Sequence, residues 1–99
     1  MRENVYQRRL IRKVDAMFDG QALIVKNDAG YQQGILDLTV FYGPRWGMLE
    51  VKASALAPHR PNQDYWVQRM DEMGFAAFIY PENETEVLYA LREALQPRR

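Results

Sequence analysis

The chain has 99 residues, which suits a single domain, 1–99, with a modest core. Apolar residues make up 47% and charged residues 26%, the proportions of an ordinary soluble globular protein, and no apolar run reaches the roughly 18 residues of a membrane span. The net charge of zero counts mildly against a nucleic-acid binder, and the lack of cysteine excludes disulfides and thiolate metal sites. With no signal-like apolar stretch at its start, the chain is expected to be cytoplasmic, without membrane partners.

The first predicted element is a helix over residues 3–18. Its apolar residues recur in steps of three and four, at Leu10, Val14 and Phe18, with arginines between them. Asp19 and Gly20 mark its end.

The middle of the chain predicts a β-meander. Residues 22–27 are a short β-branched run, and the polar residues 27–34 that follow are typical of a turn. The segment "ILDLTVFY" over 35–42 predicts a strong strand, "GPRWG" over 43–47 a hairpin turn, and "MLEVKAS" over 48–54 the returning strand.

The last part of the chain alternates helix and strand. A loop over 55–63 with two prolines leads to a helix over 62–74, a buried-type strand over 75–80 and a closing helix over 82–95. The order α-β-β-β-α-β-α predicts a three-layer α/β fold with a mixed central sheet, whose fourth strand joins in parallel through a right-handed crossover.

Three charged side chains interrupt the apolar strands. Asp37 lies in the second expected strand, and Glu50 and Lys52 lie on one face of the third, because side chains alternate along a strand. If the pairing centres near Pro44 and Arg45, Asp37 lies across from the end of the returning strand, and a bulge or wider loop would change that register. The three side chains can then meet near one edge of the sheet.

These residue types suit a site for a hard divalent cation. Asp37 and Glu50 supply carboxylate oxygens, which Mg²⁺ prefers, and the carbonyl of Val51 lies between the charged side chains as a further oxygen. Lys52 can orient an attacking water or stabilise charge on a phosphate. The alternative is a carboxylate–lysine pair that lies half exposed on the sheet face and only stabilises the fold.

Three segments together resemble the PD-(D/E)XK nuclease superfamily, and in particular its VRR-NUC branch. They are "GILDLTV" over 34–40, "MLEVKAS" over 48–54 and "PNQDYWVQRMDEMGF" over 61–75. That branch includes stand-alone phage and bacterial nucleases and relatives among Holliday-junction resolvases. The resemblance spans about residues 3 to 90 and implies a restriction-endonuclease-like fold.

The family motif can be followed residue by residue. A glycine leads into the strand with the metal-binding aspartate, and here these are Gly34 and Asp37. The proline expected before the aspartate is Leu36, a departure at a position that does not touch the metal. The E-x-K core matches residues 50–52, and the glutamine expected at the start of the next helix matches Gln63.

The resemblance implies hydrolysis of phosphodiester bonds with Mg²⁺, or Mn²⁺ as its substitute. Asp37, Glu50 and the Val51 carbonyl would hold the metal. Lys52 would assist the water, and Gln63 would steady the water or contact the scissile phosphate.

Family members often carry a further glutamate on the first helix. Glu3 is the candidate here, with Gln7 one turn later on the same face. If Glu3 contributes, a second metal could bind, and the two ions could clamp the entering and leaving oxygens.

Basic residues outside this cluster are candidates for contacts with DNA phosphates. They are Arg8, Arg9, Arg12 and Lys13 on the outer face of the first helix, and Lys26, His59 and Arg60. The alternatives are a solvated helix face and, for the histidine, a solvated surface residue. Tyr65 and Trp66 could stack on bases, although Trp66 fits the apolar stripe of its helix; Trp46 at the expected hairpin tip could be a dimer contact or a DNA wedge.

The resemblance therefore predicts an endonuclease for branched DNA, of the Holliday-junction-resolvase kind, with a place in DNA recombination or repair. A homodimer would place two sites to cut two strands symmetrically. Two alternatives stay open: a flap or nicking accessory nuclease, and a DNA-binding module that keeps the nuclease fold without turnover.

Overall fold

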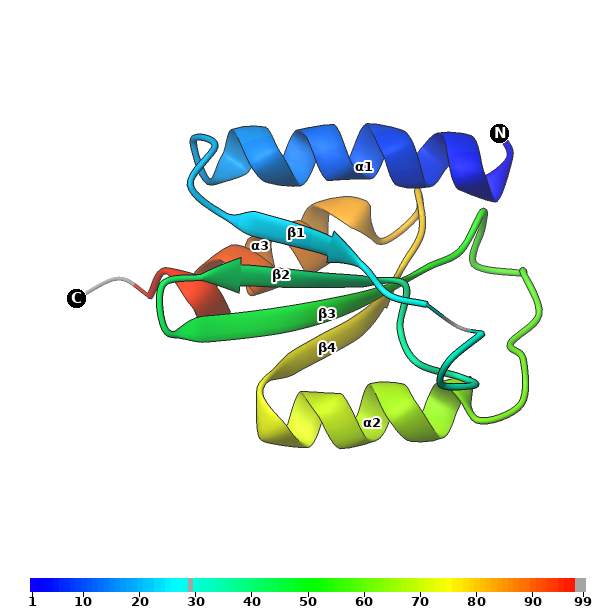
Figure 1. Ribbon diagram of the computed structural model, residues 1–99. Coiled ribbons are helices and arrows are strands. Elements are labelled where there is room, and N and C mark those ends of the chain that lie inside the picture. Colours follow the sequence, from blue (N-terminus) through cyan, green and yellow to red (C-terminus); the bar gives the residue numbers. More distant parts are fainter. Residues whose placement is uncertain (29, 98–99) are drawn as a thin grey trace.

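Seven elements of secondary structure follow one another in the predicted order. The computed structural model describes residues 1–28 and 30–97. The elements are α1 (Glu3–Met17), β1 (Leu23–Lys26), β2 (Leu38–Tyr42), β3 (Arg45–Val51), α2 (Gln63–Met73), β4 (Phe75–Ile79) and α3 (Glu84–Leu95) (Figure 1). The prediction of an α/β fold with a mixed sheet is confirmed. No helix in the described ranges is long and apolar enough to cross a membrane.

The sheet has the strand order β1-β2-β3-β4. The first three strands form an antiparallel meander, and β4 lies parallel to β3 because α2 carries the chain back between them. Helices α1 and α3 cover one face, and α2 covers the other beneath β3 and β4 (Figure 1). The result is a three-layer arrangement in which both faces of β3 are covered.

The core lies between α1, α3 and the sheet. Leu10 and Val14 of α1 meet Leu49 and Val51 of β3, and Leu91 closes the cluster from α3; all five are fully buried. The alternate residues of β3 face α2, so Glu50 points away from this apolar cluster. The period of two in β3 therefore places Glu50 on the side of the sheet that faces α2.

The β2–β3 hairpin is tighter than predicted. Tyr42 pairs with Arg45, which leaves a two-residue loop in place of the five-residue turn expected over 43–47. Gly43 has a φ of 59° and precedes Pro44, an arrangement typical of a type II′ turn.

The short loop changes the environment of Trp46. The residue belongs to β3 and is half-buried, and a Cβ built on Gly74 would lie 2.8 Å from its ring. The indole thus packs on the end of α2. The expectation of an exposed indole at the hairpin tip is wrong, because Trp46 is a half-buried residue of β3. Its part as a dimer contact or DNA wedge stays a prediction.

At the end away from the hairpin, both strands stop short of their expected limits. The last β2–β3 pair joins Leu38 to Leu49, so the register centres on Gly43 and Pro44, one residue before the predicted centre. Asp37 precedes β2 and lies next to Glu50 in this register, and Lys52 follows the last residue of β3. The charged residues thus lie where the backbone pairing between β2 and β3 stops.

Candidate functional site

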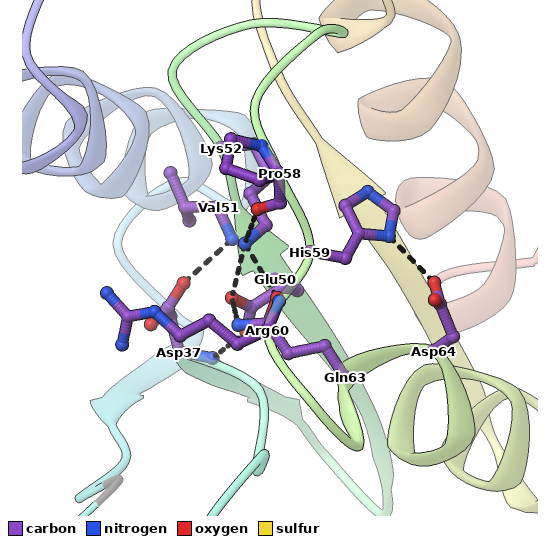
Figure 2. A network of polar contacts seen from close by, with 9 residues as sticks. All are labelled: Asp37, Glu50, Val51, Lys52, Pro58, His59, Arg60, Gln63 and Asp64. Carbon is purple, nitrogen blue, oxygen red and sulfur yellow. Dashed lines mark hydrogen bonds and ion pairs between the residues drawn. The ribbon is translucent and has the colours of Figure 1, made fainter.

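Four of the predicted residues meet at one end of the sheet. Asp37 lies just before β2, Glu50 near the end of β3, Lys52 just after it, and Gln63 in the first turn of α2 (Figure 2). They line one pocket of about 200 Å³. Its remaining walls are Glu3, Gln33, Gly34, Ile35, Arg60 and Pro61.

The charged pair is buried. Glu50 is 3% exposed, Lys52 4% and Gln63 6%. The alternative of a half-exposed ion pair on the sheet face is therefore wrong, because α2 and the loop before it cover this face. Ionised groups at such depth need partners, since an unpaired buried charge is strongly destabilising.

The amide of Gln63 stands between the two charges. Its Nε2 donates to Oε2 of Glu50 at 2.7 Å, and its Oε1 accepts from Nζ of Lys52 at 2.6 Å. The direct distance from the Lys52 Nζ to the Glu50 Oε2 is longer, 3.8 Å. The glutamine thus links the acid and the amine, and its orientation is set by which end faces which charge.

Two backbone groups of the loop over 52–62 complete this arrangement. The carbonyl of Pro58 accepts from the Lys52 Nζ at 3.2 Å, and the amide N–H of Arg60 donates to Oε1 of Gln63 at 2.8 Å. Neither contact is predictable from the sequence, because any residue type can supply a backbone group. The loop conformation decides them.

Beyond the last β2–β3 pair, the two carboxylates accept hydrogen bonds from backbone N–H groups. Oδ2 of Asp37 accepts from the backbone N–H of Val51 at 2.8 Å. In return, Oε1 of Glu50 accepts from the backbone N–H of Asp37 at 3.2 Å. This reciprocal pair holds the two acids side by side, each taking an N–H of the other strand (Figure 2). The part of the Val51 carbonyl in holding a metal stays a prediction.

The electrostatics of the pocket are unbalanced. The pKa of Glu50 is raised to about 8, chiefly by burial and next by the charge of Asp37, which outweighs the opposing charge of Lys52. At neutral pH Glu50 therefore keeps a proton when no cation is bound. When both are ionised, Asp37 and Glu50 carry one more negative charge than Lys52 balances. Their oxygens are hard donors that lie side by side, so the pocket fits a divalent cation.

Glu3 reaches the pocket from the first turn of α1 but not the carboxylate pair itself. It is half-buried and lines the same pocket as Asp37. Within residues 1–28 and 30–97, no group of three or more His, Asp or Glu side chains is placed to hold one ion. The geometry thus supports a centre with two carboxylates, and Gln7 is half-buried farther along α1.

The basic residues on α1 differ in whether they have an acidic partner. Arg8 and Arg12 are exposed, as predicted. Lys13 is also exposed but forms an ion pair with Glu84 at the start of α3, where the hydroxyl of Tyr6 donates to the same carboxylate at 2.8 Å. Burial alone would raise the pKa of Glu84, but the hydrogen bonds from Lys13 and Tyr6 outweigh it and lower that pKa.

The other predicted DNA contacts lie in different places. Arg60 lines the pocket, Lys26 is exposed at the end of β1, and Arg9 is exposed on α1 with an Nη1 contact of 3.5 Å to the Met1 sulfur. His59 faces away from the carboxylates: its ring stacks on Phe78 with centroids 4.1 Å apart.

His59 also contacts α2. Its Nδ1 lies 2.7 Å from Oδ1 of Asp64, beside the site (Figure 2). Since its neighbours in the loop are Pro58 and Arg60, the histidine fastens the segment that holds Lys52 and Gln63. On α2, Tyr65 is exposed and Trp66 is half-buried.

Comparison of the chain with protein-family models, with curated proteins and with solved structures finds no match. The assignment of a function therefore rests on the geometry of this pocket and on the motif in the sequence.

Proposed function

We propose that this protein is a Mg²⁺- or Mn²⁺-dependent endonuclease that hydrolyses DNA phosphodiester bonds at the pocket between β2, β3 and α2, with a fold and site of the PD-(D/E)XK kind. One observation carries the proposal. Asp37 and Glu50, two carboxylates held side by side, share a pocket with a buried lysine, and the charge of Asp37 acts on Glu50 more strongly than the charge of Lys52 does.

The two acids would hold the metal, and each has a defined part. Glu50 must lose its proton when a cation binds, so binding releases protons at neutral pH. Asp37 uses one oxygen for the Val51 N–H, which keeps its carboxylate oriented at the pocket wall. When bound, a divalent ion would lower the pKa of a water and offset charge on the phosphate.

The lysine is positioned to act on the substrate. Gln63 and Pro58 accept hydrogen bonds from the ammonium of Lys52, which has three N–H donors in all. The remaining donor can serve a phosphate oxygen or the attacking water. Because both ends of the Gln63 amide are occupied, this residue is better explained as the support of Glu50 and Lys52 than as a direct phosphate contact.

The natural substrate is a finer proposal, drawn from the sequence resemblance. It is branched DNA, cut by a homodimer in the manner of a Holliday-junction resolvase. A flap or nicking enzyme is the nearest alternative. Mass measurement in solution, together with cleavage of junction, flap and linear substrates, separates these possibilities.

A DNA-binding module without turnover is the second candidate function. The hydrogen bonds favour a site without turnover, because every buried side-chain nitrogen and oxygen in the described part of the chain has a partner. A network satisfied in this way is also what a purely structural charge pair requires.

Cleavage assays decide between the two. The purified protein is incubated with four-way junctions, flaps and linear duplex in Mg²⁺ or Mn²⁺, alongside Asp37→Ala, Lys52→Ala and the exposed control Asp15→Ala. We expect cleavage by wild type and the control, and at least about 100-fold less by the two site variants. Equal cleavage by all four would identify a contaminant and reject the site. A wild type that binds DNA but leaves all substrates intact would support the binding module.

A further inference from the structure

Two apolar side chains stand out into solvent on the loops that form the pocket. Tyr31 is 91% exposed and Leu56 is 92% exposed, whereas the next most exposed large apolar residues described, Met1 and Leu23, are 62% exposed. Isolated apolar residues are common on protein surfaces. Here, however, the two extreme cases occur on the two loops whose other residues line one pocket. Figure 1 shows both loops leaving the same end of the sheet.

The loop with Tyr31 is fastened at both ends. At its neck, Nδ2 of Asn27 donates to the carbonyl of Leu36 at 2.8 Å and to Oγ1 of Thr39 at 2.9 Å. At its far side, Gly34 has a φ of 88°, and a Cβ there would lie 2.8 Å from the Trp66 ring. The glycine thus lets the loop lie directly on α2.

The tip of the same loop is a hydrogen-bonded turn. The N–H of Tyr31 donates to the carbonyl of Asp28 at 3.1 Å, and a side-chain oxygen of Asp28 accepts from the N–H of Gly30 at 2.8 Å. The backbone is therefore shaped at the position where the tyrosine ring extends into solvent. An aromatic ring held out in this way is available to a flat partner.

Leu56 occupies a similar tip on the second loop. Its N–H donates to Oγ of Ser54 at 3.3 Å, and the N–H of Ala57 donates to the Ser54 carbonyl at 3.2 Å. The N–H of Ala55 donates to Glu82 at 3.2 Å, which ties the turn to the segment after β4. This apolar residue is thus also presented by an ordered turn.

The distances along the chain place both residues near the pocket. Tyr31 lies two residues from Gln33 and Leu56 four residues from Arg60, and both of these line the pocket. Fully extended chain would span at most about 7 Å and about 14 Å over these intervals. Each of the two loops that line the charged pocket therefore carries one exposed apolar side chain close to it.

We propose that Tyr31 and Leu56 contact unpaired nucleobases on either side of the phosphodiester held in the pocket, so that the preferred substrate has unpaired bases at the cleaved step. A nucleic-acid strand alternates charged phosphates with flat apolar bases, which matches separate apolar contacts beside a charged pocket. A protein partner would instead call for one contiguous apolar patch. In an intact duplex the bases are stacked inside and out of reach. The inference rests on the proposed function, because it takes the pocket as the phosphodiester site.

Binding measurements test the inference without requiring turnover. Fluorescence anisotropy in Ca²⁺ compares a duplex with an unpaired tract to a fully paired duplex of the same sequence, and gels check that both stay intact. A 2-aminopurine in the tract reports stacking directly. We expect wild type to prefer the unpaired tract and to quench the 2-aminopurine.

Variants at the two tips should lose this preference. Tyr31→Ala and Leu56→Ala should each weaken binding to the unpaired tract between about 5-fold and 100-fold, with little change for paired duplex. Tyr31→Trp should retain it. The matched controls are Tyr89→Ala on α3, where the tyrosine is 59% exposed, and Leu23→Ala on β1. Both should bind like wild type.

Two outcomes would overturn the inference. The first is an unchanged preference for the unpaired tract in both tip variants. The second is altered self-association of the tip variants in sedimentation with unchanged DNA binding, which would make the tips protein contacts. Its failure is distinct from that of the proposed function. Selective binding that depends on the tips, without cleavage in Mg²⁺ or Mn²⁺, would reject hydrolysis alone. Cleavage that ignores both tip substitutions would reject the base contacts alone.

Discussion

We expect the metal-free protein to lose stability as the pH rises from about 5 to 8, because Glu50 resists ionisation in its buried position. The pKa of Glu50 is raised from 4.5 to about 8, mainly by burial and next by the charge of Asp37. A carboxyl with a raised pKa holds its proton longer in the folded state than in the unfolded state. Its favourable contribution is therefore complete below about pH 4.5 and is lost progressively up to the folded pKa.

The magnitude follows from the difference in bound protons. Between the two pKa values the folded state binds about one more proton at Glu50 than the unfolded state does. The free energy of unfolding then falls by up to about 1.4 kcal/mol per pH unit. From about pH 5 to 7 this amounts to roughly 2 to 3 kcal/mol, a large share of the stability of a small domain.

Urea unfolding in EDTA at unit steps of pH measures this slope. Glu50→Gln has no group to ionise and should show a flatter profile, whatever its absolute stability. The difference between the two profiles isolates Glu50, because other titrating groups are common to both proteins. Glu72→Gln, at an exposed acid on α2, should retain the wild-type slope. Parallel profiles for wild type and Glu50→Gln would refute the argument that Glu50 is protonated at neutral pH.

Three further predictions concern the same region. In calorimetry at pH 7.5, Mn²⁺ or Mg²⁺ should raise the melting temperature of wild type, since a cation relieves the repulsion of the two acids. Asp37→Asn should show no such rise, and an equal rise in the variant would contradict the metal assignment. Gly34→Ala should lower the free energy of unfolding in urea by about 1 to 3 kcal/mol more than Gly20→Ala does. Both glycines have positive φ, but of the two only Gly34 has atoms within 3 Å of the added Cβ. Equal losses would show that the contact relaxes. Gln63→Leu should destabilise by about 3 kcal/mol in the same assay, since the buried Lys52 ammonium and the buried Glu50 carboxyl group both lose a hydrogen-bond partner. Gln68→Leu on the exposed side of α2 should change little, and comparable effects would argue against the bridge.

Local patterns in the sequence predicted much of the fold. The order of elements and the position of each helix follow from periodicity, and the ends agree within one to three residues at most positions because Gly and Pro mark them. The start of β3 was placed late, since "GPRWG" reads as one turn although two residues suffice to close it. Local sequence indicates that the chain turns, but strand pairing decides how tightly.

The candidate site was predictable in part. Strand alternation placed Glu50 and Lys52 on one face, and Asp37 one hairpin earlier was expected to join them, which it does. Their burial was not readable, because it depends on α2 and the preceding loop covering that face. The pairing of Lys13 with Glu84, 71 residues later, likewise exists only because α1 and α3 pack on the same side of the sheet.

The sequence alone determined which chemical groups the chain can bring to this end of the sheet, because alternation along a strand is a local rule. Only the tertiary structure decided how those groups share their hydrogen bonds. The amide of Gln63 lies between Glu50 and Lys52 because the start of α2 is folded against the end of β3. The raised pKa of Glu50 has the same origin, since burial and proximity to Asp37 are properties of packing across strands and layers.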